Sequence, residues 1–192
     1  EGSYIHVTVS FGVSHFYEED NDAEICFQNA YIALNEAKSA AIAGLEVYNQ
    51  RLKSQVTRRV LLEMSMREAL EAGEMYPVYQ PIVGVDGKGE TQLAGVEALI
   101  RWESPSLGFV SPSEFIPIAE NSRFIVDIGR WMIEKTLSDL TQMKAQGGQS
   151  IYLSLNAASA EFEQPDFADY LLESIRSNGH SEADVIVELT ER

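Results

Sequence analysis

The sequence predicts an α/β fold with a strand–helix–strand block first, a long helix next, and alternating strands and helices to the end. Two features lead to this prediction. Residues 50–72 contain neither Pro nor Gly and are rich in strong helix formers. From residue 74 onward, short apolar runs alternate with segments of helical periodicity, which is typical of a parallel α/β sheet or barrel.

The first block is too short to close a hydrophobic core of its own. Its predicted elements are a strand at 4–13 that ends at Gly12, a helix from a capping box at Asn21 and Glu24 to Gly44, and a strand at 45–48. We expect three regions along the chain, at 1–49, 50–73 and 74–192, and the middle one would be a connector helix.

The last region carries most of the predicted elements. Strands are expected at 75–83, 93–102, 151–156 and 185–191, with a turn at 85–90 between the first two. Helices are expected to begin at Ser111-Pro112-Ser113-Glu114, to cover 125–146, and to run from Pro165 to near Gly179.

Composition excludes several classes of function. The 192 residues include 14 basic and 30 acidic side chains, for a net charge of −16. Such a surface repels nucleic acid, and no apolar run is long enough to span a bilayer, so we expect this segment to contact neither. Cys26 is the only cysteine, and His6, His15 and His180 are widely spaced. A disulfide framework and a thiolate or histidine-rich metal site are therefore not expected.

The stretch GVEALIRW, at 95–102, places two opposite charges in an apolar strand. Because side chains alternate along a strand, Glu97, Leu99 and Arg101 would share one face. Glu97 and Arg101 would be about 13 Å apart, too far for either to neutralise the other, so each needs its own partner if that face is buried. A half-solvated antiparallel strand would show the same charged face, and this explanation stays open.

Two more polar side chains stand at or near strand ends, Asn156 and Glu188. Ligands collect at the carboxyl ends of strands in α/β folds. With Glu97 they offer oxygen donors that suit Mg²⁺ or Mn²⁺, while the guanidinium of Arg101 fits phosphate. Asn156 also fits ordinary turn chemistry. Pattern alone thus indicates an α/β domain and leaves a cation site open.

Glu97-Ala98-Leu99 resembles the signature of the EAL family, bacterial phosphodiesterases that act on cyclic di-GMP. Other motifs of that family occur in its order, namely YQPIV at 79–83, SPSEFIPIAE at 111–120, IGRW at 128–131, LSLN at 153–156 and VELTE at 187–191. In the first block, VTVSFGV at 7–13 and ALNEAK at 33–38 resemble the C-terminal end of a GGDEF domain. Departures from the two patterns are Tyr31, Asn35, Arg123 and Ala158.

The resemblance implies that 74–192 is the front half of a TIM-like barrel of EAL type, in a parent protein that hydrolyses cyclic di-GMP to linear pGpG with Mg²⁺ or Mn²⁺. It implies the following roles: Glu97, Asn156 and Glu188 as metal ligands, Arg101 as a phosphate ligand, and Gln80 and Leu99 as the lining of the nucleotide site. The family's paired aspartates, lysine and general base would follow Arg192. The 192-residue chain alone is therefore expected to be inactive, with no catalytic residue beyond the metal ligands.

Two other functions stay open: a catalytically inactive receptor that binds cyclic di-GMP, and a regulatory or dimerising module with a degenerate GGDEF half. The resemblance also implies a homodimer, through the EAL domain or the connector helix. A cytoplasmic location is expected, with any tether to the inner membrane in a portion before residue 1.

Overall fold

The computed structural model describes residues 7–16, 22–39, 44–85, 87–147 and 151–190. It divides the chain into two compact units, Glu1–Leu61 and Leu62–Arg192. Strands and helices occur in both, which confirms the predicted α/β class. Within the described ranges, no helix is both long and apolar enough to cross a membrane.

The first unit contains a small parallel sheet with a helix against it. Its elements are β1 (Phe11–Val13), α1 (Ala23–Ser39), β2 (Leu45–Val47) and the first part of α2 (Gln50–Glu71). β1 pairs with β2 in parallel. A Cβ added to Gly12 would come within 2.2 Å of the carbonyl oxygen of Ala30, so the close approach of β1 to α1 requires glycine.

Some predictions for this unit need correction. The strand expected at 4–13 is shorter, because only Phe11–Val13 pairs with β2, while residues 4–6 lie outside the described part of the chain. The predicted cap Asn21 also lies outside it. Asp22 accepts a hydrogen bond from the backbone N–H of Glu24, with 2.9 Å between nitrogen and oxygen, and so caps α1.

The second unit is built on a mixed sheet. Its strands are β3 (Met75–Val85), β4 (Thr91–Ser104), β5 (Gly108–Val110), β6 (Tyr152–Ala158) and β7 (Val185–Thr190). The order is β3-β4-β6-β7, with β5 paired to β4. The β4–β6 and β6–β7 pairs are parallel, as expected, but β3 and β4 are antiparallel. The prediction of a parallel sheet is therefore wrong for β3 and β4. A short connection without a crossover helix joins these two strands, which allows only antiparallel pairing.

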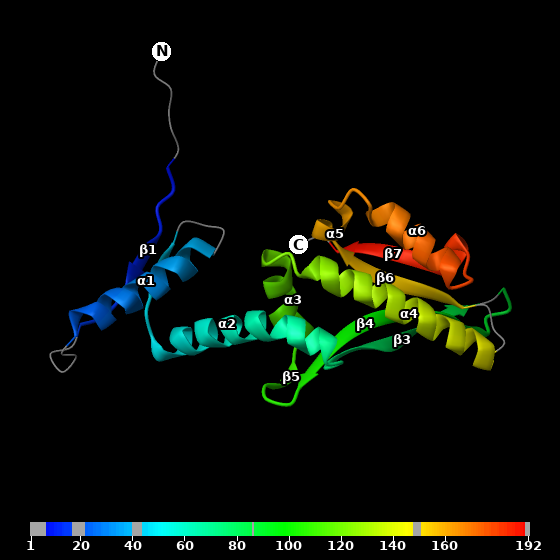
Figure 1. Ribbon diagram of the computed structural model, residues 1–192, viewed down its shortest axis with the longest axis horizontal. Coiled ribbons are helices and arrows are strands. Elements are labelled where there is room, and N and C mark those ends of the chain that lie inside the picture. The colour runs from blue at the N-terminus through cyan, green and yellow to red at the C-terminus, as the bar shows by residue number, and fades with distance from the viewer. Residues whose placement is uncertain (1–6, 17–21, 40–43, 86, 148–150, 191–192) are drawn as a thin grey trace, which may run out of the picture. The chain divides into compact units, whose positions relative to one another are not determined.

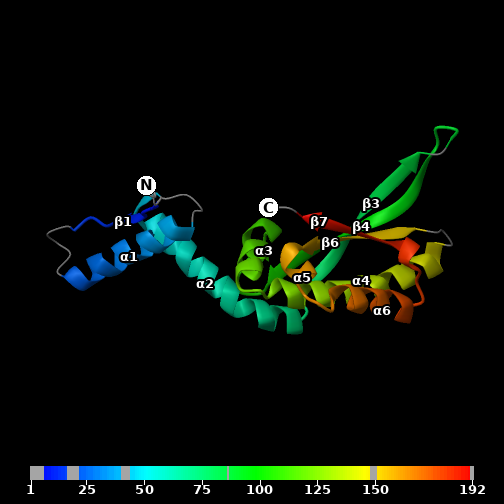
Figure 2. The same ribbon diagram turned by 90° about the horizontal axis from the view of Figure 1, so that it is seen from above.

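Helices connect the parallel strands and cover one side of them. They are α3 (Pro112–Asn121), α4 (Ile125–Gly147), α5 (Ser159–Phe162), α6 (Phe167–Ser177) and the short 3₁₀ helix η1 (Glu182–Asp184). In Figure 1, α4 runs along the sheet and α6 lies beside β6 and β7. Figure 2 shows α4 and α6 on the same side of β6 and β7, with no described helix on the opposite side.

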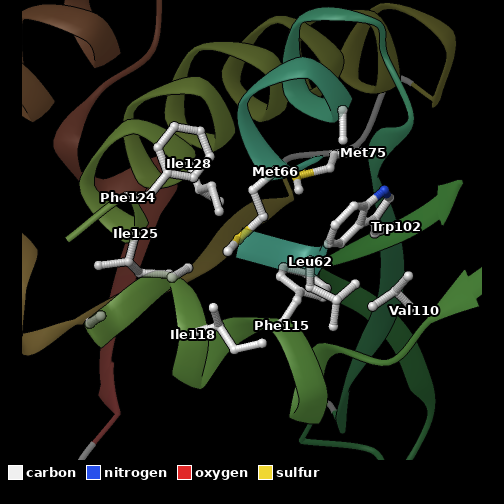
Figure 3. Close-up of a cluster of buried hydrophobic side chains, with 13 residues drawn as sticks. Leu62, Met66, Met75, Trp102, Val110, Phe115, Ile118, Phe124, Ile125 and Ile128 are labelled. Carbon is white, nitrogen blue, oxygen red and sulfur yellow. The ribbon is translucent and has the colours of Figure 1, made fainter. Parts of the chain in front are cut away.

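A first core cluster lies where the second part of α2 and helices α3 and α4 pack against the ends of β3, β4 and β5 (Figure 3). Leu62 and Met66, one helical turn apart on α2, are almost wholly buried here. The fully buried Trp102 packs edge-on against Phe115, with 5.5 Å between ring centroids. Its indole N–H donates to Glu74 at 3.0 Å, so the buried polar atom is satisfied.

A second core cluster joins the sheet to α4 and α6. Its wholly buried members are Leu137 and Leu140 of α4 and Leu153 of β6. Val96 and Ala98 of β4 also belong to it, as the alternation of GVEALIRW predicts. This cluster fixes the register of β4 and β6, because a slip of one residue would exchange their two faces.

The turn between α3 and α4 contains one unusual backbone conformation. Arg123 has a φ of 60°, in the left-handed region that favours glycine. The structure thus explains why a glycine would suit this position. Ser111 and Pro112 do begin α3 as predicted, although the Ser111 side chain makes no capping hydrogen bond and contacts Ser113 instead.

Candidate active site

Polar side chains gather on the side of the sheet that carries no described helix, which we call the open face. It consists of Gln80, Glu97, Leu99, Arg101, Ser154, Asn156 and Glu188, which alternate with the core residues of the same strands. Strand register brings them together. Gln80 stands opposite Glu97, Glu97 beside Ser154, and Asn156 beside Glu188. All six predicted site residues therefore lie on one face of one sheet.

The two predicted carboxylates flank the central strand β6, Glu97 on β4 and Glu188 on β7. The Asn156 side-chain amide donates to Glu97 Oε1 at 2.8 Å. On the other side, the Ser154 hydroxyl donates to Glu188 Oε1 at 2.5 Å. β6 thus supplies one hydrogen-bond donor to each of its neighbours' carboxylates, and the nearest partner of Glu97 is a carboxamide rather than a basic group.

In the described part of the chain, neither carboxylate is neutralised by a nearby base. Among the residues that the structure describes, no ion pair involves Glu97 or Glu188. No group of three or more His, Cys, Asp or Glu side chains that could hold a metal ion occurs in the same part of the chain. The candidate cation ligands are therefore two carboxylates, Glu97 and Glu188, and the carboxamide of Asn156. All three offer hard oxygen donors, and they lie on β6 and its two neighbouring strands. This donor set fits Mg²⁺ or Mn²⁺ and does not fit zinc.

Arg101 lies further along β4 than Glu97, toward the carboxyl end. It is half-buried, and its Nη1 donates to the backbone oxygen of Ile100 at 2.8 Å. The other guanidinium N–H groups can reach a ligand, because one such contact uses one of five donors. The structure therefore separates the two charges of GVEALIRW, as the strand spacing predicts.

A cavity of about 170 Å³ adjoins the carboxyl ends of β4 and β6, between these strands and helices α3, α4 and α5. Its lining is mostly apolar and includes Arg101, Pro112, Ile116, Met132, Asn156 and Glu161. The open face and this cavity thus share Leu99, Arg101 and Asn156, so polar groups of the site border an apolar recess.

Glu161 is a buried acid in the wall of this cavity, and sequence reasoning did not find it. Its side chain is only 4% exposed, and Oε2 accepts a hydrogen bond from the backbone N–H of Ala158 at 2.7 Å. Burial raises the pKa of Glu161 to about 7, against the lowering effect of that hydrogen bond. Oε1 lies so close to Gly129 that a Cβ there would be 1.9 Å away.

Ser154 is the second residue that the sequence analysis missed. A signal for it existed, because Ser154 stands two positions before Asn156 and alternation puts both side chains on one face. Its contact with Glu188 spans 34 positions, so only the pairing of β6 with β7 reveals it.

Comparison with known proteins assigns the family. A model of the EAL domain matches residues 63–192, more than half of the chain. The chain therefore belongs to the EAL family, as the motifs predict.

Similar proteins fit this assignment. The biofilm architecture maintenance protein MbaA of Vibrio cholerae is 34% identical over 189 residues, which cover 98% of this chain and 24% of MbaA. The cyclic di-GMP phosphodiesterase NbdA of Pseudomonas aeruginosa is 24% identical over 191 residues, covering 100% of this chain and 24% of NbdA. This chain spans about a quarter of the length of such curated relatives.

Solved structures agree with the sequence comparison. The PaMucR phosphodiesterase, solved as a complex with c-di-GMP, superposes with a TM-score of 0.61 at 28% identity. The match covers 68% of this chain and 52% of that one. The second unit thus has the fold of part of an EAL domain.

Proposed function

We propose that the parent protein is a cyclic di-GMP phosphodiesterase that hydrolyses its substrate to linear pGpG with Mg²⁺ or Mn²⁺. The observation that carries this proposal is the donor set around β6, in which Glu97 and Glu188 flank Asn156 on the open face of an EAL-family sheet. Relatives that are named cyclic di-GMP phosphodiesterases support the choice of substrate.

Glu97, Asn156 and Glu188 would hold the cation. The chemistry that Mg²⁺ or Mn²⁺ supplies when bound is polarisation of the phosphoryl group and activation of water for attack on phosphorus. The hydrogen bonds from β6 would limit how far the two carboxylates can swing, and each bond uses only one carboxylate oxygen, Oε1. Three hard ligands on adjacent strands are a rigid scaffold for this role.

The remaining open-face residues would bind the substrate. Arg101 presents a planar set of N–H donors that suits a phosphate, and it offsets the repulsion expected from a protein with a net charge of −16. Gln80, directly opposite Glu97, and Leu99, between Glu97 and Arg101 on the same face, would line the nucleotide. One side of the substrate would then meet charge and the other an apolar wall.

We further propose that the first unit is the C-terminal end of a GGDEF domain and that α2 connects it to the EAL domain. The boundary between the two compact units and the start of the EAL match both fall within α2, at residues 61–63, which supports this division. A cytoplasmic homodimer through the EAL domain or α2 belongs to the same proposal. The 192-residue chain alone is expected to be inactive.

Hydrolysis by the full-length protein tests this function. Formation of pGpG is followed with Mg²⁺ or Mn²⁺ and again after chelation, for wild type, Glu97→Ala and Glu173→Ala. Glu173 is an exposed carboxylate on α6, so its variant controls for the loss of one negative charge. We expect chelation and Glu97→Ala each to lower turnover by at least about 100-fold, and Glu173→Ala to leave it unchanged.

The same samples distinguish a phosphodiesterase from a catalytically inactive receptor. If the wild type binds cyclic di-GMP tightly and forms no pGpG with either cation, the protein is a receptor and the phosphodiesterase proposal fails. Equal turnover in wild type and Glu97→Ala would instead refute the ligand role of Glu97.

A further inference from the structure

Ser154 occupies an unusual place on the open face. It lies in β6 between the two carboxylate strands, beside Glu97 in the register with β4. Its side chain is fully buried, whereas Asn156, two residues further along the same face, is exposed. The Ser154 hydroxyl therefore forms the floor of the site, below the level at which a ligand would bind.

The hydroxyl of Ser154 donates its hydrogen bond to the carboxylate of Glu188. It donates to Oε1 of Glu188, and the 2.5 Å distance is that of a charge-assisted O–H···O⁻ bond. Without such a bond, a glutamate side chain at an exposed strand position samples several rotamers, and holding it in one orientation costs conformational entropy. The bond engages Oε1 of Glu188 and so restricts the orientation of its carboxylate.

Burial alone does not explain this bond. Glu188 is exposed, so water can solvate its carboxylate without Ser154. An alanine at position 154 would remove a buried hydroxyl that needs an acceptor, and would leave no buried polar atom unsatisfied. A serine here therefore contributes little to stability that alanine would not, and its consequence is the orientation of Glu188.

We propose that Ser154 is a positioning residue for the cation site, which holds the carboxylate of Glu188 in the orientation that binds Mg²⁺ or Mn²⁺. The inference rests on the proposed function only in taking Glu188 as a ligand of the cation. Asn156 has the equivalent relation to Glu97, so β6 orients both flanking carboxylates from one strand. Partners of this kind change metal affinity rather than the fold when they are removed.

Mn²⁺ binding to the full-length protein tests the inference without recourse to turnover. The affinity is measured by titration calorimetry, or from the electron paramagnetic resonance signal of free Mn²⁺, for wild type, Ser154→Ala, Glu188→Ala and the double variant. Ser104→Ala is the matched control, because Ser104 is a buried serine of β4 whose hydroxyl contacts no carboxylate among the described residues and lies 3.4 Å from the hydroxyl of Ser106.

We expect Ser154→Ala to weaken Mn²⁺ binding by about 10- to 100-fold and Ser104→Ala to leave it unchanged. Because Ser154 acts through Glu188, Ser154→Ala should have no further effect once Glu188 is alanine. The inference is overturned if Ser154→Ala binds Mn²⁺ with wild-type affinity. It is also overturned if the loss of Mn²⁺ affinity in the double variant equals the product of the losses in the two single variants. A wild type that fails to bind Mn²⁺ at millimolar concentration overturns it as well.

A different result would refute the proposed phosphodiesterase function while leaving the role of Ser154 intact. If the wild type binds Mn²⁺ with the expected dependence on Ser154 but forms no pGpG from cyclic di-GMP, the positioning role stands and the phosphodiesterase reaction does not.

Discussion

The two faces of the same strands differ in what they contribute to the molecule. On the face covered by α4 and α6, β6 presents Leu153 and Leu155, which are almost wholly buried in an apolar cluster. On the open face the same strand presents Ser154 and Asn156, each hydrogen-bonded to a carboxylate of a neighbouring strand. Side chains one residue apart thus belong to a core and to a candidate active site.

Substitutions on the two faces should have different effects. The covered face contributes free energy of folding, because its side chains are removed from water. The open face holds two carboxylates, one on each side of β6, with no ion-pair partner among the described residues, and this arrangement suits a cation. Substitutions on one face should therefore change stability, and those on the other should change ligand binding.

The largest expected loss of stability follows Leu153→Ala. Leu153 has no exposed surface, so its truncation leaves a cavity and should lower the free energy of unfolding by about 3 kcal/mol. The matched open-face change is Asn156→Ala in the same strand, expected to cost less than about 1 kcal/mol. Denaturant unfolding of both variants measures this, and equal losses would contradict the division of the two faces.

A substitution in the wall of the cavity, at Gly129, should have the next largest effect. Gly129→Ala places a Cβ 1.9 Å from Oε1 of Glu161, and the buried carboxylate cannot move without losing its bond to Ala158. We expect a loss of about 2 kcal/mol. Gly147→Ala near the end of the same helix, where a Cβ meets no atom within 4 Å, is the control and should not destabilise. If both variants unfold alike, Glu161 is not packed against Gly129.

The buried acid should make stability depend on pH. Because the folded-state pKa of Glu161 is raised to about 7, the unfolded chain loses this proton first as the pH increases. The stabilisation is complete below about pH 4.5 and is lost as the pH rises through 7. Glu161→Gln removes the charge, so at pH 8 the variant should be more stable than wild type by up to about 3 kcal/mol.

That advantage should shrink to below about 1 kcal/mol near pH 5, where Glu161 is protonated in the folded protein. The measurement is the free energy of unfolding of wild type and Glu161→Gln at both pH values, with the exposed Glu173→Gln as control. A stability difference that is the same at pH 5 and pH 8 would show that the Glu161 carboxyl does not titrate in this range.

The smallest expected change is a gain. Arg123 has a φ of 60°, and a non-glycine residue in this region costs about 1 kcal/mol. Arg123→Gly should raise the free energy of unfolding by about that amount, less the weak exposed ion pair with Glu163 at 3.3 Å. Arg123→Ala loses the pair but keeps the strain, so thermal unfolding should show a gain only for glycine.

Much of the second unit follows from local pattern. Alternation along GVEALIRW predicts which side chains of β4 share a face, and the structure confirms this because strand periodicity depends only on neighbouring residues. The starts of α3 and α4 follow from Ser111-Pro112 and from helical spacing for the same reason. Short elements such as β5 and α5, of three and four residues, carry too little pattern to be predicted.

What the sequence could not reveal depends on contacts between distant residues. The bond from Ser154 to Glu188 requires the register of β6 with β7, and the pKa of Glu161 requires burial against Gly129 on another helix. Gln80 was assigned to the site only through the family resemblance, whereas Glu97 and Glu188 had already been grouped with Asn156 as polar residues at or near strand ends. Their convergence on one face is a property of the sheet.

The most direct test of this account is turnover of cyclic di-GMP by full-length Asn156→Ala, under conditions in which unfolding measurements show the variant to be fully folded. Asn156 contacts Glu97 from the strand between the two carboxylates and contributes nothing to the covered core. We expect a folded Asn156→Ala protein to lose at least about 100-fold in pGpG formation. A folded variant with wild-type turnover would contradict the assignment of the open face as the active site.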